Sequence, residues 1–139
     1  MLLELSVYYR FINDYCDINH IPHFIKKGFA PDLEGGPKSF LMILAGQTLK
    51  KQKRSDAQKR KIISKWGKAG VFSQALELME ISFYSIQQHL FRAKKNMNNQ
   101  NFEQLEKFLQ SVHFKQEPQD NFYENLNGAM YKLPIKPVL

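Results

Sequence analysis

The stretch from residue 72 to residue 98 constrains the fold more than any other part of the sequence. Its apolar residues recur at alternating steps of four and three, which places them along one side of an α-helix. These residues are Phe72, Leu76, Met79, Phe83, Ile86 and Leu90. Other elements have to cover such a stripe, so we predict a helix at about residues 73–98 as the centre of a bundle. A two-chain coiled coil is the alternative, and the short chain favours the bundle.

The rest of the chain has the same helical character. No segment alternates apolar and polar residues with the period of two that marks a half-buried strand. Apolar spacings of three and four predict further helices at about residues 2–16, 40–53, 56–68 and 102–114. Three prolines and three glycines interrupt residues 18–37, where we expect only a short helical turn at 23–27. We therefore predict an all-α fold, one domain over residues 1–139 with about five helices.

Capping residues mark where several of these helices begin. Ser39 is a predicted N-cap, and Ser55 with Gln58 is typical of a capping box. Asn101 with Gln104 resembles a capping pair in the same way. The periodicities predict a core that includes buried side chains from four of the helices. These are Leu44, Ile63, Trp66, Leu76, Met79, Phe83, Ile86, Leu105 and Leu109.

Residues 118–139 form a predicted tail that prolines interrupt. A short turn is expected to start at Asp120, to hold Phe122 and Leu126, and to end at Gly128. The last ten residues are apolar and extended in character. We expect them to pack back on the bundle, and insertion into a partner protein is the alternative.

Positive charge is concentrated between Lys38 and Lys68. This stretch holds ten Lys or Arg residues and one acid, Asp56, a net charge of +9, whereas the whole chain carries +7. The remainder of the chain is therefore slightly acidic. A local cationic surface attracts polyanions, and nucleic-acid backbones are the commonest of these in cells.

The predicted helix at 56–68 gives these charges a direction. At 100° per residue, Ile62, Ile63 and Trp66 fall on one side, and four cations fall on the other: Arg60, Lys61, Lys65 and Lys68. Only Lys59 lies among the apolar positions, where its stem is expected to pack while its ammonium reaches water. This arrangement favours binding to a nucleic-acid backbone. A merely solvated face and contact with an acidic protein are the alternatives.

No motif for catalysis is present in the sequence. It contains no Gly-rich phosphate loop before a helix, no nucleophile motif and no cluster of His and carboxylate residues at ligand spacing. We therefore expect that the protein is not an enzyme and that it binds no cofactor. Cys16, His20 and His23 are residues of types that bind zinc. The set lacks a fourth ligand and Pro22 interrupts it, so no metal is expected.

Composition gives an expected location. Cys16 is the single cysteine, which fits a reducing compartment, and the N-terminus lacks the basic and apolar regions of a signal peptide. No run of 18 apolar residues occurs, so no membrane span is expected. We predict a cytoplasmic protein that does not associate with a membrane.

The run from Phe40 to Gln52, FLMILAGQTLKKQ, resembles the apolar, small-residue helix of the small all-helical subunits in CRISPR effector complexes of the Cascade type. Size, basic charge and helicity fit the same family. The resemblance implies a non-catalytic subunit that is present in several copies along a ribonucleoprotein and contributes to antiviral defence. Its cations would hold the guide-paired target or the displaced strand.

The sequence thus predicts binding of RNA or single-stranded DNA through the backbone, without sequence preference, together with other protein subunits. Lysine-rich helices contact phosphates, which position a nucleic acid without reading bases. A second group of cations near residue 94 is included in the predicted contact set. That set is Lys50, Lys51, Lys53, Arg54, Lys59, Arg60, Lys61, Lys65, Lys68, Arg92, Lys94 and Lys95. The alternative is a protein–protein adaptor or inhibitor that uses an aromatic surface and the apolar tail; steep salt dependence would separate phosphate binding from it.

Overall fold

The computed structural model describes residues 2–36, 38–117 and 120–123, and within these ranges every regular element is a helix. The α-helices are α1 (Leu2–Asn19), α2 (Ile21–Lys27), α3 (Phe40–Ala45), α4 (Asp56–Lys68), α5 (Val71–Ala93) and α6 (Asn99–Val112). Two short 3-10 helices, η1 (Pro31–Glu34) and η2 (Lys94–Asn96), complete them. The all-α prediction is confirmed.

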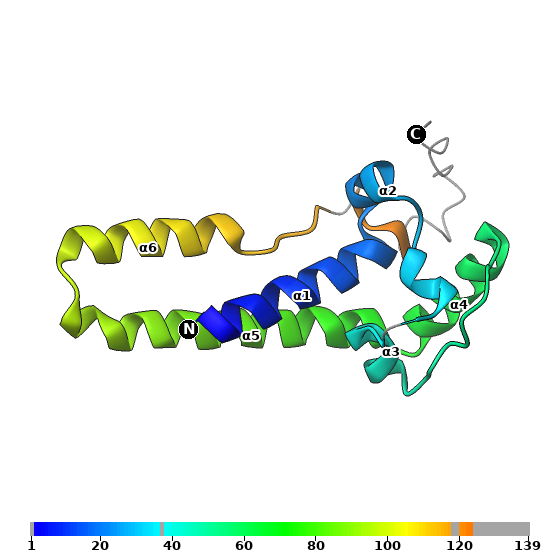
Figure 1. Cartoon of the computed structure of the whole chain (residues 1–139), viewed down its shortest axis with the longest axis horizontal. Helices are drawn as coiled ribbons and strands as arrows, with labels where there is room; N and C mark the ends of the chain where they lie inside the picture. The colour runs from blue at the N-terminus through cyan, green and yellow to red at the C-terminus, as the bar shows by residue number, and fades with distance from the viewer. Residues whose placement is uncertain (1, 37, 118–119, 124–139) are drawn as a thin grey trace.

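Helix α5 is the centre of an elongated molecule, as its apolar seam predicted (Figure 1). It contacts α1, α3, α4 and α6. Helices α2, α3 and α4 gather with η1 at the N-terminal end of α5 and form what we call the head. At the other end α6 turns back antiparallel to α5, and the two helices form a hairpin.

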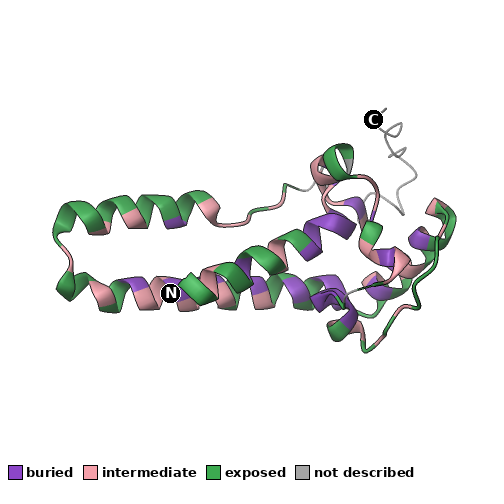
Figure 2. Cartoon of the chain, in the orientation of Figure 1, coloured by how far each residue is buried: buried purple, intermediate pink, exposed green. Residues whose placement is uncertain are grey.

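The core lies mainly in the head and along the contact between α1 and α5 (Figure 2). Aromatic rings connect these two helices: the rings of Tyr8 and Phe83 lie 5.6 Å apart, and those of Tyr15 and Phe72 lie 6.4 Å apart. Of the predicted core residues, six are buried: Ile63, Trp66, Met79, Phe83, Ile86 and Leu109. Most of the heptad-like seam of α5 is therefore buried against other parts of the same chain.

Three predicted core residues are less buried than expected. Leu44 and Leu105 are partly buried against the core. Leu76 is 37% exposed, and the prediction that it is buried is wrong. It lines a cavity of about 280 Å³ together with Tyr8, Met79 and Phe114.

The predicted helix at 40–53 is wrong beyond Ala45, where α3 ends. Gly46 adopts a left-handed conformation with φ 65° and ψ 24°. Its N–H donates to the Ile43 carbonyl at 3.1 Å, and the Gln47 N–H donates to the Met42 carbonyl at 3.0 Å. This pair of bonds is a Schellman motif, which satisfies the last carbonyls of a helix and stops it. The run that resembles the CRISPR subunits is thus helical only in its first half.

Residues 18–37, predicted as a break with a short helical turn at 23–27, contain α2, which covers that turn, and η1. Pro22 is accommodated because it lies in the first turn of α2, where no intrahelical N–H bond is lost. Two buried carboxylates of α1 then fix the chain that follows. Asp17 Oδ2 accepts from the Asp32 N–H at 3.0 Å, and Asp14 Oδ2 accepts from the Phe40 N–H at 3.0 Å.

The helix caps follow the sequence with one exception. Ser39 accepts from the Met42 N–H, and Ser55 and Gln58 form the complete capping box. The predicted pair of Asn101 and Gln104 is wrong, because the side chain of Asn98 accepts from the Asn101 N–H and α6 begins three residues earlier.

Beyond α6 the chain returns along α1 through hydrogen bonds to its side chains. The Tyr8 hydroxyl accepts from the Phe114 N–H at 2.7 Å, and the Tyr15 hydroxyl donates to Gln116 Oε1 at 2.8 Å. Phe122 is buried, and its ring lies 5.0 Å from that of Phe29. The predictions for Leu126, Gly128 and residues 130–139 lie outside the described residues.

Candidate nucleic-acid interface

Helix α4 is fixed to the head along one side. Ile63 and Trp66 are buried, and the indole Nε1 of Trp66 donates to Gln47 Oε1 at 2.9 Å. The capping box supplies partners for two backbone donors at the first turn. The orientation of α4 is therefore set by its buried side and its cap.

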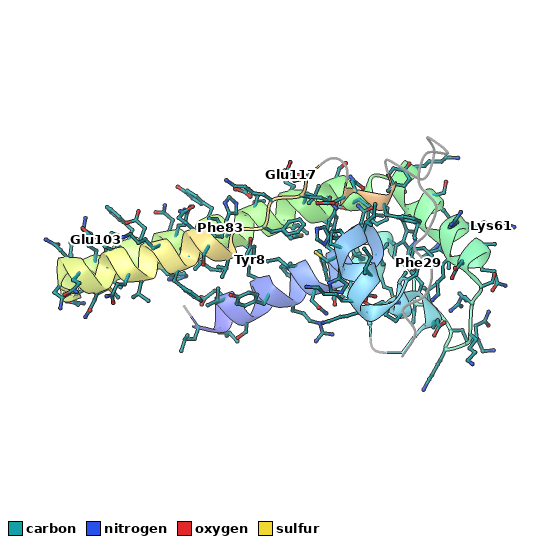
Figure 3. The ribbon with its side chains drawn as sticks, turned by 90° about the horizontal axis from the view of Figure 1, so that it is seen from above. Tyr8, Phe29, Lys61, Phe83, Glu103 and Glu117 are labelled. Atoms are coloured by element: carbon teal, nitrogen blue, oxygen red, sulfur yellow. The ribbon has the colours of Figure 1, made fainter. Side chains whose placement is uncertain are left out.

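The opposite side of α4 presents three exposed lysines: Lys61, Lys65 and Lys68. Their spacing of four and three residues keeps them within about 60° around the helix axis. Figure 3 shows Lys61 at one end of the molecule, far from Glu103 at the other. These three ammonium groups form a cationic row, and the buried side of α4 fixes the direction in which the row points.

Lys59 does not belong to that row. Its Nζ donates to the Phe29 carbonyl at 2.8 Å and lies 3.2 Å from Glu34 Oε1. The residue is buried, so the prediction that its ammonium reaches water is wrong. A buried ammonium requires such partners because desolvation of an unpaired charge is costly. Lys59 holds α4 against the head and is left out of the contact set proposed below.

The two arginines of the basic stretch are half-buried. Arg54 donates from a guanidinium nitrogen to the Leu33 carbonyl at 2.8 Å, so it fixes the start of α4 to η1. Arg60 precedes Lys61 in the chain, and its Nε is buried without a hydrogen-bond partner among the described residues. Arg54 therefore has mainly a structural role, and Arg60, which is only half-exposed, is left out of the contact set proposed below.

Lys50, Lys51 and Lys53 are exposed, but on an irregular segment and not on the predicted helix. This segment packs closely on η1: the Gln52 N–H donates to the Glu34 carbonyl at 2.9 Å. Gly35, with φ 86°, has no room for a Cβ, which would lie 2.7 Å from the Lys51 Cα. The loop is thus held in place beside the start of α4. We call the exposed lysines of the loop and of α4 together the basic patch: Lys50, Lys51, Lys53, Lys61, Lys65 and Lys68.

The second predicted group of cations lies at the other end of the molecule. Arg92, Lys94 and Lys95 are exposed where α5 passes into η2, and the length of α5 separates them from the head (Figure 1). Lys94 Nζ lies 4.7 Å from the centre of the Phe102 ring, a cation–π contact. The structure therefore divides the predicted contact set into two groups, one at each end of α5.

The residues considered for metal binding have other surroundings. Burial raises the pKa of the Cys16 thiol to about 12, which keeps it protonated. His23 Nε2 lies 3.7 Å from Asp17 Oδ1. In the part of the chain that the structure describes, no group of three His, Cys, Asp or Glu side chains is arranged to hold a metal ion.

The sequence patterns did not predict the apolar side chains exposed on the hairpin, which include Tyr84, Phe91 and Phe108. The sequence did contain a pattern for two of them, since Tyr84 and Phe91 stand seven residues apart on α5.

Among the described residues, no helix combines the length and apolar composition needed to cross a bilayer. No protein-family model, curated protein or solved structure matches the chain.

Proposed function

We propose that this protein binds the backbone of RNA or single-stranded DNA through the basic patch, without sequence preference and without catalysis. The observation that carries the proposal is the row of Lys61, Lys65 and Lys68 on α4, opposite buried Ile63 and Trp66. Exposed ammonium groups held at fixed spacing suit a line of phosphates. Contacts from ammonium groups to phosphates position a nucleic acid without reading its bases.

The setting that fits such a surface is a subunit within a larger ribonucleoprotein. The resemblance to small CRISPR effector subunits suggests one such assembly, in which Lys and Arg grooves hold guide-paired or displaced strands. The run that carries this resemblance is a helix only as far as Ala45. We therefore propose a subunit of a ribonucleoprotein in general, and not a subunit of one particular complex.

The experiment is a titration of the purified full chain against two unrelated single strands of equal length. Lys61→Glu/Lys65→Glu reverses two charges of the row. Lys107→Glu/Lys115→Glu makes the same charge change at exposed positions on and after α6 and serves as the matched control. We expect the first variant to lose affinity for both strands equally and the control to lose much less.

Two outcomes contradict the proposal. Equal weakening in both variants would show that net charge alone, and not the basic patch, attracts the strand. Loss confined to one of the two strands would indicate base recognition. Circular dichroism of each variant checks that the helical fold is retained, as expected for exposed positions.

A protein–protein adaptor is the second candidate, and the exposed aromatic side chains of the hairpin favour it. Large exposed apolar patches often mark interaction sites. Binding through such a surface would change little with salt, whereas phosphate binding weakens steeply.

A further inference from the structure

Helix α5 carries a second apolar seam on the side opposite its core seam. Ile81, Tyr84 and Phe91 are 57%, 60% and 65% exposed. They lie within about 80° around the helix axis, and Glu77 and Gln88 fall between them. The steps from Glu77 through Ile81, Tyr84 and Gln88 to Phe91 are four, three, four and three. This is the heptad spacing of a helix that packs against another helix.

The charges at the two ends of this outer seam are opposite in sign. Glu77 lies at its N-terminal end, whereas Arg92 and Lys95 lie at its C-terminal end, Lys95 within η2. Neither Glu77 nor Lys95 has an ion-pair partner among the described residues. A surface with one sign at each end is complementary to its own copy when the two run antiparallel.

We propose that the outer seam of α5 docks against the same seam of a second copy, as an antiparallel and isologous helix pair. In this register Ile81 of one copy packs against Phe91 of the other, and Tyr84 packs against Gln88. Glu77 then faces Lys95 of the second copy, twice in each dimer. A parallel pair would instead place Glu77 opposite Glu77, which is repulsive.

The same register leaves room for the heads. It is centred at Ile86, so the N-terminal end of each α5 extends past the C-terminal end of the other. The two heads, which carry the basic patches, therefore lie at opposite ends of the pair.

A single helix from each copy is a small contact, at or below the roughly 1,200 Å² at which stable complexes begin. We expect a reversible dimer whose population rises with protein concentration.

The first test is sedimentation equilibrium of the full chain from low to high micromolar concentration, after nuclease treatment so that no strand bridges two copies, and at low salt so that the Glu77 and Lys95 charges are not screened. Ile81→Gln is compared with Ile43→Gln, which alters a residue of α3 that is 60% exposed. We expect Ile81→Gln to weaken the dimer about tenfold and Ile43→Gln to leave it unchanged. A wild-type monomer at every concentration, or equal effects of the two variants, would overturn the proposal.

The second test identifies the register. Glu77 and Lys95 of one chain are about 27 Å apart along the helix axis, at 1.5 Å per residue, so they cannot pair within a chain. Glu77→Lys and Lys95→Glu should each weaken the dimer by about tenfold. The double variant Glu77→Lys/Lys95→Glu should restore it. A double variant weaker than either single variant would exclude the antiparallel register. This proposal is independent of nucleic-acid binding, which Ile81→Gln should not affect in a strand short enough for one copy.

Discussion

The two ends of α5 both carry clustered cations, in very different surroundings. At the head, Lys61, Lys65 and Lys68 project from a helix whose other side is buried through Ile63 and Trp66. At the hairpin, Arg92 lies in the last turn of α5 and Lys94 and Lys95 follow it in η2, where cations also suit the helix dipole. A count of charges cannot separate these cases. The buried opposite face separates them, because it fixes the direction in which the lysines point.

The largest expected effect concerns packing along α5. Phe83 is buried, and its ring stacks on His113 with 3.8 Å between the centroids, whereas Phe91 is exposed on the outer seam. Phe83→Ala should lower the free energy of unfolding by about 3–5 kcal/mol, the usual cost of a large cavity. Phe91→Ala should change it by less than about 1 kcal/mol. Urea unfolding followed by circular dichroism measures both, at low protein concentration to keep the chain monomeric.

If Phe91→Ala destabilised the monomer as much as Phe83→Ala, the outer face of α5 would be part of the core. The distinction between a packed inner seam and a free outer seam would then be wrong.

The next effect separates two lysines of one helix. Lys59→Met removes the hydrogen bond from Lys59 Nζ to the Phe29 carbonyl and the ion pair with Glu34. It should cost about 1.5–3 kcal/mol, the range for hydrogen bonds to charged groups. Lys61→Met should cost less than about 0.5 kcal/mol, because Lys61 is exposed.

For binding to a single strand, the order of the two effects should be reversed. Under conditions where both variants are folded, Lys61→Met should weaken binding to a single strand and Lys59→Met should not. A stable Lys59→Met variant that binds poorly would return Lys59 to the contact set. Thermal unfolding and fluorescence anisotropy provide the two measurements.

Local signals in the sequence were sufficient for α4. The capping box and the apolar spacing gave the bounds Asp56–Lys68 as observed, together with the side on which Ile63 and Trp66 are buried. The inner seam of α5 likewise required only periodicity, although Leu76 is exposed. These features depend on residues close together in the chain.

The failures have two different causes. Lys59 became buried because Phe29 and Glu34, roughly 25 to 30 positions earlier in the chain, supply its partners. The helix at 40–53 was predicted from its apolar spacing and the Ser39 cap, but the local Gly46 motif stops it and the loop that follows packs on η1. Neither the partner carbonyl nor the packing surface is visible in a local window.

The smallest expected effect is a pH dependence in the head. Burial, with Asp17 and Asp14 nearby, raises the pKa of Asp32 to about 7, from about 3.9 in an unfolded chain. The native state therefore retains an extra proton between these values. Its contribution to stability is fully present below about pH 4 and is lost as the pH rises through about 7. The effect is modest because Asp32 is only half-buried.

A substitution isolates this contribution from other groups. Burial lowers the pKa of His20, which acts in the opposite direction at acidic pH. Asp32→Asn imitates the protonated carboxyl, so the stability of the wild type relative to Asp32→Asn should fall between pH 5 and pH 8. Urea unfolding of both proteins at the two pH values gives the difference. A difference that does not change with pH would show that Asp32 titrates normally in the folded protein.

The most direct test of the account is the salt dependence of binding to one single strand. Each phosphate contact on a single strand contributes about 0.7 to the slope of log K against log salt. If the α4 row holds the backbone, Lys61→Glu/Lys65→Glu should reduce the magnitude of the slope by about 1.4. The control Lys107→Glu/Lys115→Glu should retain the wild-type slope. Equal slopes in all three proteins would show that the lysines of α4 face only solvent, and the proposed nucleic-acid interface would be wrong.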